Sequence, residues 1–455
     1  MNLTVQCTAG LCLLLQVRVA FLVLHFGNYG LEAATTAAAV SVPGPAVTLG
    51  PSEMIYDWDR DHCPDGVEPW QWDVPDMPAR MWRRKDGETT LIASSNLGSR
   101  ANIGPDPDHL SHACGVYYNN TCGNQAFGGG PCADAICCNP AMWADREWIF
   151  SPWIFPENDT VVALAHMEFH SQNNSAETMC DTLTASNRGA CWFNAITSFI
   201  SHDGGRNFTR LRPPPHHLVA AQPYKMPSGG PTVGPGGRGP MGYEAPSNIM
   251  RSPKDGFYYA AMQTWPFRAQ KSSSAWVDGA GKGSWNGSGN CFIRTSSLTD
   301  PKSWRGWNGK EWSVSFVDPY NDKPGAFVPE DHVCTPVLNL GYPSIGWSSY
   351  YQKYIAVGSK YWDCSDVVFA LSDDLVEWSA PIPLYQPVCK PDAAYMEIYP
   401  SLIDPASPSP NFDVIGETPY IYLVTFRKNR PSPSGIAPGS VVRSIQRRPL
   451  RMTGA

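Results

Sequence analysis

Pro343-Ser344-Ile345-Gly346-Trp347, followed by a turn and by the strand-like residues 353–358, decides the fold class because its pattern occurs five times in this chain. In each copy a Pro begins a short apolar segment, a turn follows, and a second segment rich in aromatic and β-branched residues comes next. Such residues favour strands, and the turns carry Gly, Asn and Asp. Each copy therefore predicts an antiparallel pair of strands. The other copies begin at Pro78, Pro152, Pro246 and Pro400.

A third strand is predicted after several of these pairs, and each third strand ends in a polar turn. Residues 194–200 lead into residues 201–208, which fit the Asp-box pattern Ser-x-Asp-x-Gly-x-x-aromatic. Residues 291–295 and 367–371 lead into looser versions of the same turn. Because each turn ends in an aromatic anchor, we interpret these turns as structural ties between strands.

Four-stranded sheets repeated around an axis form a β-propeller, and five openings predict five blades. We therefore expect an all-β fold, a five-bladed β-propeller over residues 56–455. The copies are longer than four strands require, so the excess is expected in loops. These are a Cys-rich loop insertion over residues 101–147 and a Gly/Pro-rich loop over residues 222–242. Residues 441–445 are predicted to form the last strand, which completes the fifth blade.

The composition excludes several other classes of protein. The 455 residues include 43 Pro and 40 Gly, and only 16% of them are charged. Because Pro costs roughly 3 kcal/mol inside a helix, the chain is not predominantly helical. An aromatic content of 12% and a net charge of −7 are unlike those of a disordered chain. The chain carries no basic tract, so it offers no electrostatic footprint for nucleic acid.

The N-terminus and the cysteines indicate the secretory pathway. Residues 9–26 are mostly apolar, and we expect a signal peptide over residues 1–35, with cleavage near residues 33–40, and a linker over residues 36–55. Arg18 lies inside the apolar run, so an uncleaved membrane anchor stays an alternative. Two of the 14 cysteines belong to this segment, which leaves twelve, an even number that suits disulfide bonds.

The spacing of the cysteines and the glycosylation sequons support the same compartment. No Cys-x-x-Cys pair with a matching second pair occurs in the sequence, so we expect the cysteines to form disulfides rather than a zinc site. The protein is therefore expected to be a secreted or extracellular glycoprotein, in contact with a membrane only if its N-terminal segment stays uncleaved. The Asn-x-Ser/Thr sequons beyond the signal segment are those of Asn119, Asn158, Asn173, Asn207 and Asn286.

The register of the five openings places two carboxylates in equivalent positions. Alternate residues of the innermost strand of a blade face the central channel. Asp76 and Glu244 both lie two positions before the repeated Pro, on the first and third predicted blades. If one of them faces the mouth of the channel, both should. The five residues at this position are Asp76, Phe150, Glu244, Gly341 and Ile398.

The chain from about residue 56 onward resembles the five-bladed propeller glycosidases, that is, glycoside hydrolase family 43 and its clan of arabinanases, xylosidases and invertase-like enzymes. The resemblance rests on the blade count, the strand openings and Glu244-Ala245-Pro246, which is similar to the place where that group keeps its general acid. It implies hydrolysis of glycosidic bonds without a required cofactor, and a structural calcium ion on the propeller axis. Residues 76–80, 245–249 and 399–402 also look like segments of uncharacterised secreted or bacterial proteins, which implies no activity.

Two carboxylates on non-adjacent blades suit an inverting mechanism, in which the acid and the base lie about 6.5–9.5 Å apart. We expect Asp76 to be the base that activates water and Glu244 to be the acid, with its pKa raised by a partly apolar surrounding. The resemblance implies a third carboxylate soon after the opening of the second blade, where Trp153, Ile154 and Phe155 stand instead. Glu168, between two histidines, is our candidate for that role.

Further residues are candidates for binding a carbohydrate substrate to what we expect to be a monomer. Arg80 follows the first repeated Pro by two positions, and it is expected either to bind a substrate carboxylate or to pair with Glu397. His166 lies beside Glu168 in the sequence. Aromatic residues at strand ends are candidates to stack on sugar rings, namely Trp153, Trp265, Trp347 and Tyr399. Weaker polar candidates are His216, His217, His332 and Asp366.

Two other functions stay open. The Asp-box at residues 201–208 suggests a sialidase-type hydrolase, although that group resembles a six-bladed propeller with an arginine triad. A propeller that binds glycan or protein without catalysis would explain why the second opening lacks a carboxylate. The fold alone does not decide between these functions, because function depends on the site.

Overall fold

The computed structural model describes residues 44–63, 74–93, 99–118, 136–137, 139–170, 192–224, 241–265, 289–322, 328–360, 365–387, 395–427 and 442–454. The expected signal peptide and most of the Gly/Pro-rich loop lie outside these residues. So do three of the five sequons, those of Asn119, Asn173 and Asn286.

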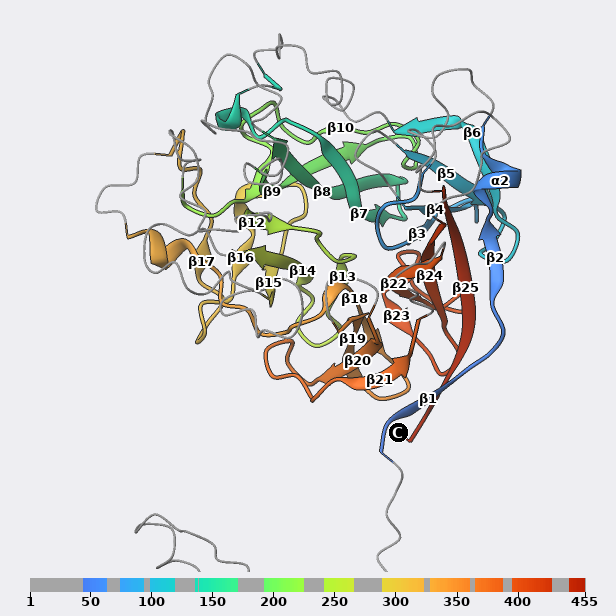
Figure 1. Ribbon diagram of the computed structural model, residues 1–455. Helices are drawn as coiled ribbons and strands as arrows, with labels where there is room; N and C mark the ends of the chain where they lie inside the picture. The colour runs from blue at the N-terminus through green and yellow to red at the C-terminus, as the bar shows by residue number, and fades with distance from the viewer. Residues whose placement is uncertain are drawn as a thin grey trace, which may run out of the picture. The chain divides into compact units, whose positions relative to one another are not determined.

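Strands dominate the described residues, and helix is limited to α2 (Trp58–Asp61) and short 3-10 turns. No helix among the described residues is long and apolar enough to cross a membrane. The described strands form four sheets, which follow one another along the chain (Figure 1). The largest sheet contains two successive groups of mainly antiparallel strands, joined by β9 and β12, so we describe five groups. The all-β prediction is therefore confirmed for the part of the chain that the structure describes.

The first two groups are built from consecutive strands. The first group joins β3 (Arg80–Arg83), β4 (Thr89–Ile92), β5 (Ser99–Gly104) and β6 (Ser111–Tyr118) in that order. The second group joins β7 (Glu147–Phe155), β8 (Thr160–His170) and β9 (Trp192–Ser201), and β9 also pairs with β10 (Thr209–Arg210) and β11 (Leu218–Ala220).

The third and fourth groups repeat this arrangement. The third group contains β12 (Met241–Glu244), β13 (Met250–Arg251), β14 (Tyr258–Trp265), β15 (Gly289–Thr295), β16 (Arg305–Gly306) and β17 (Val314–Ser315). A short parallel contact of β12 with β9 joins it to the second group. The fourth group contains β18 (Gly341–Ser348), β19 (Lys353–Ser359), β20 (Val367–Ser372) and β21 (Ile382–Tyr385).

The fifth group combines the two ends of the described chain. Its own strands are β22 (Met396–Ile403), β24 (Tyr420–Arg427) and β25 (Val442–Thr453), whereas β23 (Val414–Ile415) pairs with β18 of the fourth group. Both β1 (Ala46–Leu49) and β2 (Glu53–Tyr56) pair with β25, beside which they run in Figure 1. The predicted last strand is thus confirmed, and two N-terminal strands that we had not predicted complete its sheet.

The other strand predictions agree with the structure except in two places. Three of the repeated Pro residues stand in the first strand of a group, namely Pro152, Pro343 and Pro400. Pro78 lies two residues before β3, and Pro246 lies in residues 245–249, which separate β12 from β13. The Cys-rich insertion was expected to begin at residue 101, but residues 101–118 lie in β5, β6 and the turn between them. The alternating side chains of these strands, such as Ala101 and Ile103, pack inward and complete the first sheet.

Hydrogen bonds connect the residues that follow the repeated Pro in neighbouring groups. The Ser401 hydroxyl of the fifth group donates to the Ala79 carbonyl of the first group, at 2.7 Å. The Leu402 amide, also of the fifth group, donates to the Ser344 hydroxyl of the fourth, at 3.3 Å. Fourth and third groups are joined by Asn248, whose side chain binds the Ile345 amide at 2.8 Å and the Ile345 carbonyl at 2.7 Å.

Two more contacts continue this series. The Ser151 hydroxyl of the second group donates to the Pro246 carbonyl of the third, at 3.1 Å. The Arg80 guanidinium of the first group lies 5.9 Å from the centroid of the Phe150 ring in the second. Each group therefore contacts the next, and the fifth contacts the first.

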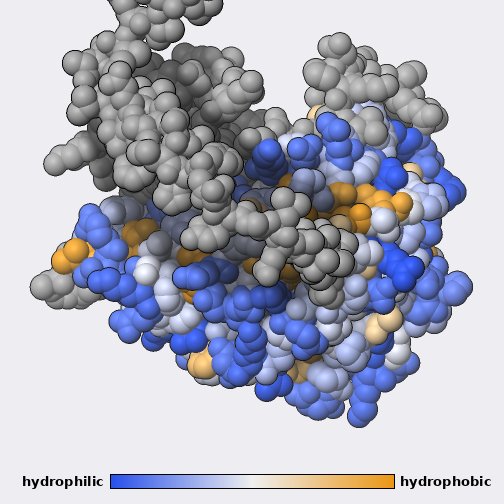
Figure 2. Space-filling view, turned by 90° about the horizontal axis from the view of Figure 1, so that it is seen from below, coloured by the Kyte–Doolittle hydropathy of each residue, from blue (hydrophilic) through white to orange (hydrophobic). Residues whose placement is uncertain are grey.

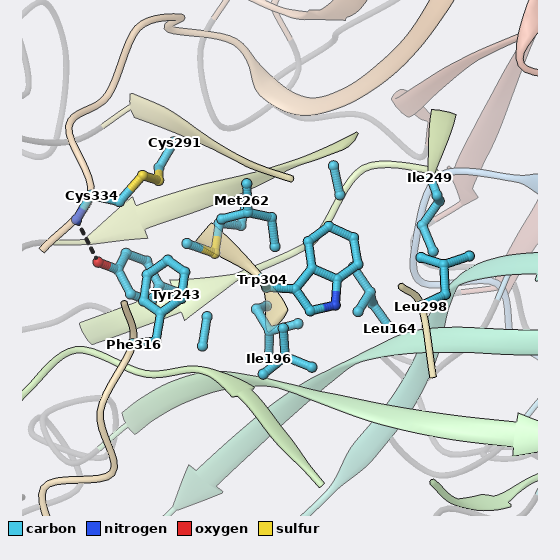
Figure 3. Close-up of a cluster of buried hydrophobic side chains, with 14 of the residues drawn as sticks. Leu164, Ile196, Tyr243, Ile249, Met262, Cys291, Leu298, Trp304, Phe316 and Cys334 are labelled. Atoms are coloured by element: carbon cyan, nitrogen blue, oxygen red, sulfur yellow. Dashed lines mark hydrogen bonds between the residues drawn. A yellow bond between two sulfur atoms is a disulfide. The ribbon is translucent and has the colours of Figure 1, made fainter. Parts of the chain in front are cut away.

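Hydrophobic clusters fill the spaces between neighbouring groups. In the cluster of Figure 3, Leu164 and Ile196 from the second group meet Ile249 and Met262 from the third around Trp304. Burying each side chain of this size stabilises the fold by roughly 1.5–3 kcal/mol. Four other clusters lie mainly between the first and fifth, third and fourth, fourth and fifth, and first and second groups.

The Asp-box is a structural tie, as we had interpreted it. The Ser201 hydroxyl accepts the Gly205 amide at 2.9 Å, and Asp203 accepts the amides of Arg206 and Asn207, both at 3.0 Å. The indole of Trp82 in the first group donates to the Gly204 carbonyl at 2.9 Å. The turn thus connects the second group to the first. Ser372 and Asp374 form a similar turn in the fourth group.

Two disulfides connect segments that are distant in sequence. Cys63–Cys114 joins the segment after α2 to β6, and Cys291–Cys334 joins β15 to the residues that precede β18. Hydrophilic residues dominate the face shown in Figure 2, and hydrophobic residues show there in limited areas. The exposed large hydrophobic residues of the described chain are Met54, Ile136 and Val328.

We expect Asn248→Ala to lower the free energy of unfolding by about 1–3 kcal/mol, because it removes two hydrogen bonds that join the third group to the fourth. Urea unfolding measures this loss as a lower midpoint at an unchanged slope. Glu311→Ala, which removes an exposed side chain, is the control. Equal midpoints for both variants would show that Asn248 does not stabilise this junction.

Candidate functional site

The backbone bends sharply just before the repeated Pro in three of the groups. Ala245, Tyr342 and Tyr399 have φ angles of 46°, 50° and 55°, a left-handed conformation that is uncommon for residues with a side chain. The strand register also shifts at this place in the fourth and fifth groups. Such bulges redirect side chains, and strained backbone of this kind costs on the order of 1–3 kcal/mol per residue. The bend determines where the neighbouring side chains lie.

Asp76 precedes the first strand group and contacts the fifth. Its carboxylate accepts a hydrogen bond from the Tyr399 hydroxyl at 3.1 Å and forms an ion pair with Arg443. The Arg443 guanidinium also lies 4.1 Å from the centroid of the Phe426 ring, which fixes its position. Burial raises the pKa of Asp76, Arg443 and Tyr399 oppose this rise, and the nearby charge of Glu168 adds to it. The side chain keeps 20% of its exposure, so water has access to it.

Tyr342 of the fourth group is near enough to Asp76 and to Glu244 for both of their charges to influence its pKa. Its ring packs edge-to-face against Tyr399, with the centroids 4.6 Å apart. Burial raises the pKa of Tyr342 well above its usual value, and Tyr399, Glu244 and Asp76 add to this rise. Its hydrogen bond to Tyr399 lowers the pKa of Tyr399, as expected if Tyr342 donates. The hydrogen bonds therefore run from Tyr342 to Tyr399 and on to Asp76.

Glu244 ends β12 and is almost completely buried, with 1% of its surface exposed. The Asn194 amide donates to its Oε2 at 2.9 Å. Burial raises the pKa of Glu244 well above its ordinary range, the Trp265 side chain opposes this rise, and Glu168 adds to it. In the described chain, no ion pair holds Glu244 in its charged form. Burial therefore favours the protonated form of Glu244.

Glu168 and His166 lie on β8, next to Asn194 of β9. The His166 Nε2 is 3.1 Å from the Asn194 Oδ1 and 3.9 Å from a Glu168 oxygen. Because the Asn194 amide nitrogen donates to Glu244, its oxygen must accept, so Nε2 of His166 carries a hydrogen. The His166 ring packs against Trp148 and Phe150. In the second group, His166 and Asn194 thus connect Glu168 to Glu244.

These side chains form one assembly to which all five groups contribute, and we call it the central cluster. Glu168 influences the pKa of both Asp76 and Glu244, so the three carboxylates that the sequence singled out as catalytic lie near one another. The central cluster consists of Asp76, His166, Glu168, Asn194, Glu244, Trp265, Tyr342, Tyr399 and Arg443.

Three members of the central cluster escaped the sequence analysis. Tyr342 shares with Tyr399 the position directly before the repeated Pro, so a register comparison shifted by one residue would have found it. Arg443 lies within the predicted last strand, and Asn194 begins a predicted third strand. Nothing in the sequence marks either residue, because their roles depend on contacts between groups.

Three predicted substrate-binding residues lie elsewhere. Arg80 does not pair with Glu397, since its guanidinium donates to the Ser401 hydroxyl and to backbone carbonyls. Glu397 instead accepts hydrogen bonds from Tyr385, Tyr395 and Gln446 and lies 3.7 Å from Arg448. Trp153 packs edge-to-face against Tyr258 inside a hydrophobic cluster. The apolar residues around the Trp153 ring make it a core residue.

The weaker polar candidates also lie outside the central cluster. His217, expected on a loop, is fully buried and pairs with Glu147 at 2.9 Å, where Arg210 and Thr197 also bind. These partners hold the pKa of Glu147 below its usual value despite burial. His332 binds the Ser315 carbonyl, His216 is exposed, and Asp366 directly precedes β20. The network around Glu147 carries a buried charge that is fully paired, which is typical of a structural role.

The described part of the chain provides no cluster of metal ligands at the central cluster. Its residues include no group of three or more His, Cys, Asp or Glu with the geometry to hold a metal ion. A cavity of about 10 Å³, room for about one water molecule, lies between the first and fifth groups. Its lining includes Tyr56, Arg100, His112 and Ile445, and none of the residues of the central cluster.

No protein-family model and no curated protein matches the chain. Among solved structures, it is similar to a xylan beta-1,4-xylosidase from Bacillus halodurans C-125, at 10% identity and a TM-score of 0.37, over 86% of this chain and 54% of that one. A GH43_12 protein from a capybara gut metagenome is similar at 11% identity and a TM-score of 0.39, over 89% and 57%. The chain thus spans about half the length of these two proteins.

An N-acetylgalactosamine deacetylase from F. plautii is similar at 9% identity and a TM-score of 0.41, over 89% of this chain and 95% of that one. Three of the similar structures are described as proteins of glycoside hydrolase family 43, the group that the sequence resembles. With TM-scores below 0.5, these likenesses carry no argument about the function of this chain.

The raised pKa of Glu244 makes a prediction about stability. When the pKa of a carboxyl group is higher in the folded than in the unfolded state, the free energy of unfolding falls as the pH rises above the unfolded pKa. We therefore expect Glu244→Gln, which resembles the neutral acid, to be more stable than wild type at pH 7, with the difference shrinking towards pH 4. Thermal unfolding across this pH range measures it.

Glu311→Gln is the matched control, because Glu311 is exposed. Its stability relative to wild type should vary little with pH. If Glu244→Gln gave the same flat profile, Glu244 would be charged in the folded protein, contrary to its burial.

Proposed function

We propose that this chain is a secreted glycoside hydrolase that cleaves glycosidic bonds by an inverting mechanism at the central cluster. One observation carries the proposal: the cluster combines Glu244, a buried carboxyl group whose pKa is raised well above its usual value, with Asp76, a partly exposed carboxyl group in which Arg443 opposes the rise in pKa that burial causes. Two carboxyl groups in environments that separate their protonation states are the requirement for paired acid and base catalysis.

Glu244 would act as the general acid. Since its Oε2 accepts the Asn194 amide, the proton is carried by Oε1, which would give it to the glycosidic oxygen as the bond to the anomeric carbon breaks. Asp76 would take a proton from water while the resulting hydroxide attacks the anomeric carbon from the opposite face. Glu244 is then left charged and Asp76 protonated, and exchange of one proton with solvent restores both.

The remaining members of the central cluster support these two roles. Arg443 and Tyr399 favour the charged form of Asp76, as a base requires. Glu168 would raise the pKa of Glu244 through its charge, which is the role of the third carboxylate that the family resemblance implies. His166 would fix the Asn194 amide that orients Glu244, and Trp265 would face the sugar beside the acid.

We further infer that the five strand groups are the blades of a closed five-bladed β-propeller. Support comes from the contacts that link each group to the next and the fifth to the first, through Ala79, Ser344, Asn248 and Ser401. The hydrophobic clusters between neighbouring groups support the same closure. The central cluster would then lie at one end of the propeller axis.

Secretion remains part of the proposal. The disulfides Cys63–Cys114 and Cys291–Cys334 favour an oxidising compartment. The sequon residues Asn158 and Asn207 are exposed, as glycan attachment requires. A cleaved signal peptide over residues 1–35 would deliver the chain to that compartment, as a monomer that binds a carbohydrate.

A panel of chromogenic arabinosides, xylosides, galactosides, fucosides and sialosides tests the activity. We expect at least one substrate to be turned over, and Glu244→Gln to lower kcat/KM by about 10²–10⁴-fold, because it removes a general acid. Asp76→Asn should cause a comparable loss, whereas Glu311→Gln should not. Inversion of the anomeric centre can be followed by NMR of the fresh product.

Three outcomes would contradict the proposal. Full activity of Glu244→Gln would remove the assigned acid, and retention of configuration would remove the assigned mechanism. If no member of the panel were hydrolysed but one bound to wild type with an affinity that Asp76→Asn abolishes, the central cluster would be a binding site without catalysis.

The hydrogen bond from Tyr399 to Asp76 makes a separate prediction. Since this bond lowers the pKa of Asp76, Tyr399→Phe should raise that pKa. A base must be charged to act, so the acidic limb of the kcat/KM profile should move to higher pH. Tyr395→Phe is the matched control, because Tyr395 donates to Glu397 outside the central cluster. Superimposable acidic limbs for Tyr399→Phe and wild type would exclude Asp76 as the base.

A further inference from the structure

Arg80 is a buried charge at the junction of the strand groups. It lies on β3 with 3% of its surface exposed. Its guanidinium donates to the Ser401 hydroxyl at 2.9 Å, to the Ala79 carbonyl at 3.3 Å and to the Pro343 carbonyl at 3.4 Å. It also lies 5.9 Å from the centroid of the Phe150 ring. One side chain thus contacts the first, second, fourth and fifth groups.

The partners of Arg80 are all neutral. In the described part of the chain, Arg80 forms no ion pair with a carboxylate, and its Nε has no hydrogen-bond partner. Burial lowers the pKa of Arg80 to about 9, which leaves it charged at neutral pH. A buried charge without a counter-ion is costly, so this arginine persists because the surrounding oxygens and the face of an aromatic ring compensate it.

The same oxygens are those that a hard metal ion would use. Calcium binds backbone carbonyl and hydroxyl oxygens, usually six to eight together with carboxylates. The family resemblance implies a calcium ion on the propeller axis, but the described residues do not fit one. They provide no acidic or histidine cluster for a metal ion, and the oxygens of Ala79, Pro343 and Ser401 already accept hydrogen bonds from Arg80. A metal ion beside the guanidinium would also be repelled by its charge.

Arg80 and each of the residues that it contacts lie close to a member of the central cluster, either in the sequence or in space. Arg80 follows Asp76 by four residues, Pro343 follows Tyr342 directly, and Ser401 follows Tyr399 by two. The Phe150 ring packs against His166, with the centroids 5.9 Å apart. Movement of Arg80 would therefore shift the segments that hold the base and both tyrosines.

We propose that Arg80 is a built-in cation that takes the place of a metal ion at the junction of the strand groups, and that it is a positioning residue for the central cluster. The second half of this statement rests on the proposed function, whereas the first does not. The experiment therefore has one arm that needs no enzymatic activity and one that does.

The first arm measures the melting temperature with EDTA and with added CaCl₂. We expect the wild type to melt at the same temperature in both. Arg80→Met should lower the melting temperature by several degrees, and Arg80→Lys, which keeps a charged donor, should recover part of that loss. Methylguanidinium should raise the melting temperature of Arg80→Ala, because the cation can occupy the vacated position. Arg83→Met, on the same strand, is the control and should respond to neither calcium nor methylguanidinium.

A wild-type melting temperature that falls with EDTA and recovers with CaCl₂ would overturn the proposal, since a metal ion would then be present. Equal melting temperatures of Arg80→Met and wild type would overturn it as well. If Arg80→Ala fails to fold, the comparison of Arg80→Lys with Arg80→Met decides, and a lysine variant no more stable than the methionine variant counts against a role for the charge.

The second arm uses the substrate identified by the panel. Arg80→Lys should lower kcat on the order of 100-fold with little change in KM, as expected when catalytic groups are misplaced but the substrate still binds. An unchanged kcat would overturn the positioning role. If the panel yields no substrate, the proposed function fails while the melting experiments still decide whether Arg80 replaces a metal ion.

Discussion

The contacts between residues that directly follow the repeated Pro are the constraint on which the rest of the structure depends. Ser401, Ser344 and Asn248 each use a short polar side chain to satisfy backbone or hydroxyl groups of the neighbouring group. A sheet could bury its apolar faces against its neighbours in many orientations. These directional bonds select one, and the hydrophobic clusters between groups then fill the space that the chosen arrangement leaves.

In three of the groups, backbone strain occurs directly before the repeated Pro, beside or at residues of the central cluster. Ala245, Tyr342 and Tyr399 have left-handed backbone conformations. Ala245 directly follows Glu244, and the two tyrosines are themselves members of the central cluster. Local strain is tolerated because the surrounding sheets over-determine the backbone, and such strain occurs often at functional sites. In these three groups, the short segment before the repeated Pro therefore affects both the stability of the fold and the geometry of the central cluster.

The sequence predicted the strand repeats and the three carboxylates because both depend on local pattern. Period-two alternation, turn residues and the position before a repeated Pro are visible without a structure. Arg443 and Asn194 were missed because each acts across a boundary between groups, where the partner is hundreds or tens of residues away. Glu147 was missed because its partners lie on other segments of its own group, as far as 70 residues along the chain. For the same reason Trp153 was taken as a sugar-binding candidate, although it is a core residue. The sequence does not show whether a Trp at a strand end faces solvent or the neighbouring sheet. The strands β1 and β2 carried no copy of the repeat and could not be assigned to the last sheet.

The pairing of β1 and β2 with β25 has a consequence for the order of folding. During synthesis β1 and β2 are made long before β25, the strand with which both of them pair. The first four groups can form from consecutive residues, whereas the fifth needs β25 and closes a contact of very long sequence separation. Until then the N-terminal strands have unpaired edges and need protection from other chains. The pairing of β1 and β2 with β25 is therefore a late step of folding during synthesis.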